Sequence, residues 1–287
     1  MLIINYKRLG CDNIKPLEGQ LVMDLDKHNL VYQSNSLVNA NYDMTALEQK
    51  LLLINISTIS KKDTNFYLNV FRVKELAELL DCTPEFLYKE LPKLSKKIIG
   101  RVVEVYNEEK GELEQFNIIH YAKYKTKQGI IELEINPRAT KYLLQLQTLF
   151  SSFELNNALH LSSKYSIRIY QITKASSYKG TEYISLDDFK SMLKLTQKSY
   201  DRYNNISGKI LNPSIKEIND NTDIELDYET VLAGRKAIGI RFKIKTKHKQ
   251  KVVHKTKHQP KSNKFFNFES HDYDYNELER QLLGWND

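Results

Sequence analysis

The chain has 287 residues, of which 41% are hydrophobic and 28% charged, so it can build a hydrophobic core and is not a disordered chain. Its formal net charge of +7 permits a polyanionic partner without requiring one. Cys11 and Cys82 form no pattern for a disulfide framework or a thiolate metal site. No stretch reads as a signal peptide or a membrane span, so we expect a soluble, cytoplasmic protein without a membrane partner.

Charge is distributed unevenly along the chain. Segment 245–264 carries eight lysines, three histidines and no acid, whereas segment 269–287 carries six acids and one arginine. We therefore predict a folded part up to residue 245, a basic flexible linker over 246–264 and a short acidic, amphipathic tail over 265–287.

The first predicted helices lie between residues 45 and about 94. Thr45 and Glu48 have the spacing of a capping box, which predicts a helix from there to about Ile59. The stretch "VKELAELLDCTPEFLYKELPKL" from Val73 is typical of a helix, a tight turn and a second helix. Thr83 is the expected N-cap of that second helix, with proline at the first helical position.

Strands and further helices follow. Alternating or β-branched residues predict strands around 102–106, 114–124 and 130–135. Asn136 and the proline after it predict the start of a helix that ends near Gln147, and another helix is expected over about 162–177.

A shift of 113 residues superimposes the second helix pair on the first. Both copies place apolar residues at the same offsets and a threonine before the second helix; the matched pairs are Val73 and Leu186, Leu76 and Phe189, Leu80 and Leu193, and Thr83 and Thr196. The second copy is followed by predicted strands over 223–229 and 236–245, joined by a turn with Gly234. Helix, helix-turn-helix and hairpin form the plan of a winged helix. We predict an α+β protein of two tandem winged-helix domains, over 1–150 (with an N-terminal extension) and 151–245.

Four stretches of the chain resemble the Rep_3-type plasmid replication initiators over roughly residues 29–245. They are "NLVYQSNSLVNANYDMTALEQKLLL", "SSKYSIRIYQITK", "SYDRYNNISGKILNPSIKEIND" and "LAGRKAIGIRFKIK". The resemblance implies two winged-helix domains, binding to direct DNA repeats (iterons) as a monomer, and bending and opening of an origin. It also implies recruitment of host replication proteins (helicase, helicase loader, initiator or primase) and repression of the protein's own gene as a dimer.

The stretch "LTQKSYDRYNNISGKI", residues 195–210, is predicted to be one helix with two faces. Tyr200, Tyr203, Ile206 and Ile210 form an apolar stripe toward the core. The opposite side carries cations and an amide, which can pair with guanine and adenine edges in the major groove. A lysine-rich solvated helix face is the simpler alternative, but this stripe has no acid. The expected DNA-binding residues here are Lys198, Ser199, Arg202, Asn205 and Lys209.

The first copy is a weaker candidate reader of bases. The shift places Glu85 and Pro92 on the matching face, and neither suits contact with guanine. Lys89, Lys93 and Lys96 can still hold phosphates, which supply affinity without sequence information. We expect the first domain to contact the DNA backbone or to form a dimer surface.

In the second hairpin, charged residues on the two strands are expected to pair with each other. The core-facing set is predicted to be Ile238, Ile240, Phe242 and Ile244. Outward cations at Arg241, Lys243 and Lys245 would face outward acids at Asp223, Glu225, Asp227 and Glu229. Arg235 and Lys236, beside the turn, have no such partners and are the predicted wing contacts to DNA.

The tail is predicted to dock on a partner protein through residues at helical spacing, and the alternative is a disordered, solubilising end. Its docking residues would be Tyr275, Leu278, Leu282 and Trp285. The stretch "FFNFESHDYDYNELERQLLGW" also looks like a C-terminal tail of several replication-related proteins from low-GC Gram-positive bacteria.

The sequence holds no motif for catalysis, a cofactor or a metal. "GRKAIGIR" lacks the Lys-Ser/Thr of a P-loop, and no histidine pair has the pattern of a rolling-circle nickase. His254 and His258 lie among lysines, which disfavours a cation. We therefore expect no enzyme, and the open alternative is a winged-helix transcriptional regulator that does not open an origin.

Overall fold

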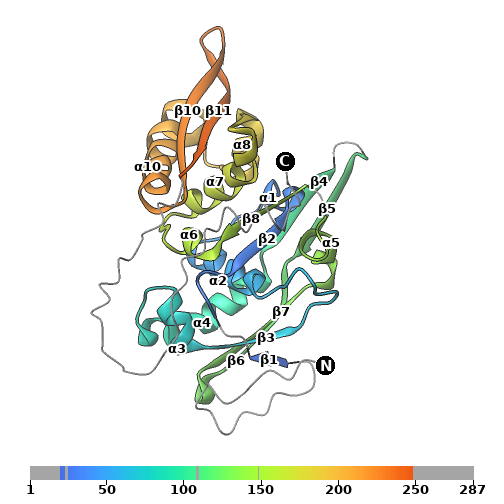
Figure 1. Ribbon diagram of the computed structural model, residues 1–287. Helices are drawn as coiled ribbons and strands as arrows, with labels where there is room; N and C mark the ends of the chain where they lie inside the picture. Colours follow the sequence, from blue (N-terminus) through green and yellow to red (C-terminus); the bar gives the residue numbers. More distant parts are fainter. Residues whose placement is uncertain (1–19, 23–24, 108–109, 148, 248–287) are drawn as a thin grey trace, which may run out of the picture. The chain divides into compact units, whose positions relative to one another are not determined.

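The computed structural model describes residues 20–22, 25–107, 110–147 and 149–247 (Figure 1). All of them belong to one compact unit. Nearly all of the predicted linker and the whole predicted tail therefore lie outside the described residues. Among the helices of the described ranges, none is long and apolar enough to cross a membrane.

The first part of the chain alternates short helices with strands. Its elements are β1 (Gln20–Val22), β2 (Leu30–Ser34), α1 (Asn35–Val38), α2 (Ala46–Ser57), β3 (Leu68–Arg72), α3 (Val73–Leu79), α4 (Pro84–Ile99), β4 (Val102–Asn107), β5 (Glu112–Asn117), β6 (Ile119–Lys125), β7 (Ile130–Ile135) and α5 (Thr140–Leu143). Strands β1, β3, β7 and β6 form a four-stranded sheet in that order, and β4 pairs with β5 as a separate hairpin.

The second part ends in a long hairpin. Its elements are β8 (Phe150–Glu154), α6 (Leu155–Leu159), α7 (Lys164–Ala175), β9 (Thr181–Ser185), α8 (Leu186–Met192), a 3₁₀ turn (Lys198–Asp201), α9 (Tyr203–Ile206), a π-helical turn (Ser207–Leu211), α10 (Asn212–Asn221), β10 (Ile224–Ala233) and β11 (Lys236–Thr246). Strands β10, β11 and β9 form one sheet, and β8 pairs back with β2.

A buried arginine joins α7 to the segment that follows α1. Arg168 is 2% exposed and donates to the carbonyl oxygens of Val38 at 2.9 Å and Ala40 at 2.8 Å. Its guanidinium also donates to the hydroxyl of Tyr42 at 2.6 Å and lies 4.0 Å from that ring. These bonds give both terminal nitrogens of the buried guanidinium a partner, whereas its Nε has none, and they hold α7 against the first domain.

The 113-residue repeat is present in the backbone. Strand β3 and helix α3 map onto β9 and α8 residue for residue, because 68–79 becomes 181–192. Asp81 and Lys194 follow the two helices, and both adopt a φ of 50°. Each copy closes its turn with the same hydrogen bonds, such as Cys82 N to the Ala77 oxygen and Leu195 N to the Lys190 oxygen. The two copies thus form the same type of turn although their sequences share little identity.

Several predicted local elements need correction. The predicted strand 114–124 is two strands, β5 and β6, which belong to different sheets. The helix expected to reach Gln147 ends at Leu143. The capping box at Thr45 is confirmed, and Thr83 caps α4 as predicted. Thr196 caps no helix, because a 3₁₀ turn follows it before the next helix begins.

Candidate nucleic-acid interface

The predicted single helix over 195–210 is wrong, and this changes the geometry of the predicted reading stripe. Arg202 has extended backbone angles, with φ −90° and ψ 116°, and stands as the N-cap of a helix that starts at Tyr203. Lys198 and Ser199 lie in the preceding 3₁₀ turn. The helical part continues through a π-helical turn to Asn221. We call residues 198–221 the recognition segment.

Asn205 connects the turn to the helix. Its side-chain Nδ2 donates to the backbone oxygen of Ser199 at 2.6 Å. One amide hydrogen is therefore already used, which weakens the expectation that this side chain pairs with adenine through both groups. The bond instead holds Lys198 and Ser199 against the start of the helix.

The apolar face of the recognition segment is confirmed. Ile206 and Ile210 are fully buried, and Tyr200 and Tyr203 are partly buried against the same core. Two hydrogen bonds fix the helix on the hairpin: the hydroxyl groups of Tyr203 and Thr230 lie 2.6 Å apart, and the Tyr228 hydroxyl donates to Asn212 at 2.8 Å. The helix and hairpin therefore form one surface.

That surface is rich in exposed cations. Along the recognition segment they are Lys198, Arg202, Lys209 and Lys216. No ion pair involves any of these four within the ranges that the structure describes. Lys216 was missed from the sequence because the helix was ended too early, although it lies seven residues after Lys209 and so on nearly the same face.

The two strands of the hairpin pair their charges largely as predicted. The register sets Glu225 opposite Lys245, Asp227 opposite Lys243, and Glu229 opposite Arg241. Lys243 forms an ion pair with Glu229, whose hydrogen bond raises the pKa of the lysine. Solvent screens such exposed cross-strand pairs, so they contribute little to stability.

Two predicted positions in the hairpin are wrong. Asp223 does not alternate outward with the other acids, because it accepts from the Tyr170 hydroxyl at 2.9 Å and from Lys174 at 2.6 Å. Ile238 is 39% exposed, whereas Ile240, Phe242 and Ile244 are buried as expected. A register shift beside Val231 places Ile238 outside the regular ladder and explains its exposure.

Arg235 and Lys236 lie at the end of the hairpin, where the structure exposes both. Gly234 starts the connecting turn with a φ of 62°, a conformation that favours glycine. The turn therefore presents two cations with no cross-strand acid opposite them.

In the first copy, the second helix begins without a preceding turn of 3₁₀ helix. Helix α4 carries Glu85 in its first turn and Pro92 in its interior. The ammonium nitrogen of Lys93 lies 3.4 Å from a carboxylate oxygen of Glu90. Lys89 and Lys96 are exposed and form no ion pair in the described part of the chain. The candidate phosphate contacts of this domain are thus weaker and partly neutralised.

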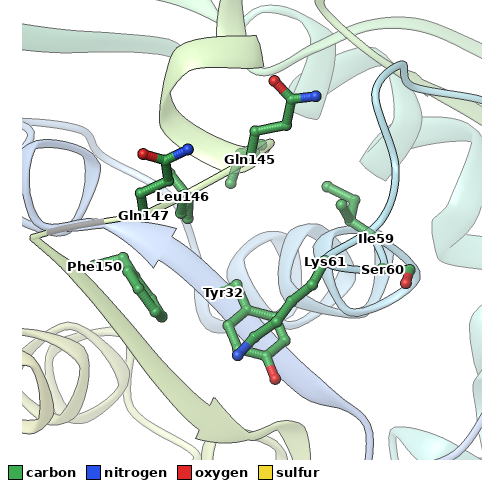
Figure 2. Close-up of a pocket in the computed structure, with 9 residues that line it drawn as sticks. Tyr32, Ile59, Ser60, Lys61, Gln145, Leu146, Gln147 and Phe150 are labelled. Atoms are coloured by element: carbon green, nitrogen blue, oxygen red, sulfur yellow. The ribbon is translucent and has the colours of Figure 1, made fainter.

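The structure also contains a pocket of about 440 Å³, which neither the recognition segment nor the β10–β11 hairpin lines. Figure 2 shows Tyr32 and Phe150 on one side, with the Lys61 side chain reaching over Tyr32. The ammonium nitrogen lies 4.8 Å from the Tyr32 ring centre and 5.8 Å from that of Phe150. No acid lines this pocket, and the described residues contain no group of three histidines, cysteines or acids that could hold a metal ion.

Comparison with known families assigns most of the described part of the chain. The family described as "Initiator Replication protein, WH1" matches residues 30–174, and "Initiator Rep protein, WH2" matches residues 185–244. The chain belongs to this family of initiator replication proteins. Its fold is therefore two winged-helix domains, as the repeat predicted. The exact boundary between 150 and 151, and the DNA-binding role of each named residue, stay predictions.

Individual relatives agree with the family. A "Replication initiation protein" of Escherichia coli is 28% identical over 206 residues, which cover 69% of this chain and 64%, less than two thirds, of the relative. A "Probable replication protein rep" of Bifidobacterium longum is 26% identical over 110 residues, 38% of this chain and 37% of the relative. A crystal structure of Pi initiator protein in complex with iteron DNA has the same fold, with a TM-score of 0.64 and 21% identity, and covers 78% of this chain and 99% of that one.

Proposed function

We propose that this chain initiates plasmid replication by binding repeated double-stranded DNA sites, or iterons, at an origin. The observation that carries the proposal is a set of exposed cations on the recognition segment and the hairpin turn of the second domain, on a winged-helix fold. The recognition segment supplies Arg202 and Lys209, and the hairpin turn supplies Arg235 and Lys236, all exposed and all without a paired acid in the described residues. Cations in this arrangement neutralise phosphates and reach guanine edges.

The two domains would have unequal roles. The second domain reads bases through the recognition segment, with Arg202 as the main reader and Lys198, Ser199, Asn205 and Lys209 beside it. The first domain holds phosphates through Lys89, Lys93 and Lys96, or forms a dimer surface. The acidic first turn of α4 supports this division, because a carboxylate beside DNA repels the backbone.

Recruitment of host replication proteins belongs to the same proposal. The resemblance to Rep_3-type initiators supports it, and the tail residues named above would supply the contact. A transcriptional regulator built on the same modules is less favoured, because the relatives are named as replication proteins. Catalytic activity is not part of the proposal.

The test uses the purified full chain and a pool of randomised duplexes. We expect repeated selection at fixed salt to yield one consensus, and a footprint on DNA flanking the gene to show that consensus as direct repeats at about two helical turns. Permanganate reactivity on a supercoiled plasmid carrying the repeats then separates an initiator from a regulator. Protection without strand opening would favour the regulator, and no selected consensus would contradict both.

A further inference from the structure

The end of the β10–β11 hairpin exposes two large apolar side chains. Leu232 is 57% exposed and Ile238 is 39% exposed. Figure 1 shows the end of this hairpin extending past α8 and α10, so helices do not cover it. We call Leu232 and Ile238 the wing-tip pair. Large apolar side chains gathered at one projecting end suggest a contact surface rather than chance exposure.

The direction of Leu232 follows from the strand that carries it. Residues two apart on a strand share a face, so Leu232 lies on the same side of β10 as Tyr228 and Thr230. Those two residues hydrogen-bond to Asn212 and Tyr203 of the recognition segment. Leu232 therefore continues the face on which the recognition segment lies, one position beyond the last of these bonds.

The bulge adds the second side chain. The ladder pairs Val231 with Gly239 and Leu232 with Ala237, which leaves Ile238 as the extra residue. Bulges turn a side chain away from its regular direction. This accounts for the exposure of an isoleucine that regular alternation would bury.

The charges at the wing tip select the kind of partner. Arg235 and Lys236 flank the pair, and residues 230–238 contain no acid. Apolar side chains among unpaired cations suit a polyanion with an apolar interior, which is the chemistry of stacked bases between phosphates. The recognition segment, with its own exposed cations, is hydrogen-bonded to this hairpin, so duplex DNA bound there would also pass the wing tip.

We propose that the wing-tip pair enters the minor groove beside the repeat, partly unstacks one base step and bends the duplex, while Arg235 and Lys236 hold the flanking phosphates. The inference rests on the proposed function and names the residues that would distort the site. Apolar side chains inserted between base steps kink DNA toward the major groove. Flexible pyrimidine–purine steps yield most easily, so we expect one at that position.

The hairpin is supported close to its turn. A Cβ placed on Gly239 would lie 2.5 Å from the ring of Tyr183, so this ring packs directly on the β11 backbone. Strand β9 pairs with β11 from Gly239 to Lys243 and stiffens the hairpin on its other edge. Only the short end of the hairpin beyond Gly239 lacks this third strand, so it can press into a groove without folding back.

The test compares the full wild-type chain with the double variant Leu232→Ser, Ile238→Ser. The probes are duplexes selected by the wild type, with 2-aminopurine placed at each step in turn and dyes at the two ends for energy transfer. We expect the wild type to raise 2-aminopurine fluorescence at one step and to shorten the end-to-end distance. The double variant should lose both changes, while its Kd rises by no more than about tenfold, because phosphate contacts supply most of the affinity.

A matched control lies on the other exposed hairpin. Leu113 on β5 is also 57% exposed, so Leu113→Ser removes the same side chain at equal exposure and should leave both signals unchanged. The pair Leu232→Met, Ile238→Met should retain them. Wild-type binding without unstacking at any step, or unstacking that persists in the double variant, overturns the inference. Changed self-association of the double variant with normal unstacking makes the tip a protein contact, which also overturns it. If the wild type selects no duplex, the proposed function itself fails.

Discussion

The two helix-turn-helix units share one turn and then diverge. From β3 to Cys82, and from β9 to Leu195, the backbone repeats at 113 residues, including a residue with φ 50° in each turn. After the turn, α4 begins at once at Pro84, whereas the second copy inserts a 3₁₀ turn and begins its helix at Tyr203. The matched core side chains thus accompany the same turn in both units. The residues after the turn decide where the second helix begins and which side chains it exposes.

The largest expected effect tests whether the matched core positions support both units. Phe189 and Leu76 occupy the same offset and are fully buried, and the Phe189 ring lies 6.3 Å from that of Phe242. Phe189→Ala should lower the free energy of unfolding by about 3–5 kcal/mol and Leu76→Ala by about 2–5 kcal/mol. Urea denaturation followed by circular dichroism measures both. A loss below about 1 kcal/mol in either variant would contradict equal roles in the core.

The next effect sharpens the difference in DNA contact. Arg202→Ala should weaken binding to the selected duplex by about 1–3 kcal/mol and relax specificity at one base pair. Lys89→Ala, its counterpart in the first copy, should weaken binding to every duplex alike. Titration against the selected duplex and its single-base variants at fixed salt separates these outcomes. Equal losses on all duplexes for Arg202→Ala would make it a phosphate contact.

A smaller effect concerns residues that disfavour a regular α-helix. Helix α4 contains Pro92, and the recognition segment contains Gly208. Gly208 lies in the π-helical turn and is exposed, and a Cβ there would meet no atom within 4 Å. Gly208→Ala should therefore raise the free energy of unfolding by about 0.5–1 kcal/mol, because alanine loses less backbone entropy in a helix. Thermal denaturation measures it. A less stable variant would show that the π-helical turn needs glycine.

The smallest effect concerns a contact that only the second turn makes. Lys194 forms an ion pair with Glu104 of β4, and its hydrogen bond lowers the pKa of that carboxyl. A lowered carboxyl pKa contributes stability above the unfolded value, about 4.3, and this is lost as pH falls through the folded pKa. Glu104→Gln should cost up to about 1 kcal/mol near pH 7.

The difference between the variant and the wild type should shrink as the pH falls through the lowered pKa of Glu104, because the wild-type carboxyl then becomes protonated. Urea denaturation over a series of acidic pH values and at pH 7 provides the comparison. A difference that stays constant over the series would attribute the effect to packing instead of charge.

Sequence reasoning located the repeat because apolar offsets in a helix pair are a local pattern. Leu76 and Phe189 recur with the turn, and Thr83 has the chemistry of a cap. The start of the second recognition helix could not be predicted the same way. Tyr200 and Tyr203 keep helical spacing through the 3₁₀ turn, so hydrophobic periodicity alone does not reveal that the backbone opens at Arg202.

The misplaced hairpin residues have a different cause. Asp223 alternates correctly along the strand, but tertiary contacts with Tyr170 and Lys174 on α7 decide its direction. Ile238 reads as a core residue until a bulge removes it from the ladder. Both depend on groups distant in sequence, which a pattern along one strand does not contain. The candidate cations were predictable from the sequence as residue types, whereas their exposure and their lack of an ion pair within the described residues required the fold.

Helix α7 has a consequence for how the chain can be divided. Arg168 attaches it to the carbonyl oxygens of Val38 and Ala40, while Tyr170 and Lys174 attach it to Asp223 before β10. The first family match ends at residue 174, at the end of this helix, and the second begins at residue 185. Cleavage of the chain between the two matches would leave the C-terminal fragment without α7. Cleavage before α7 would leave the N-terminal fragment without it. The two winged-helix domains therefore share α7. We expect that neither domain can be exchanged between relatives as an independent unit.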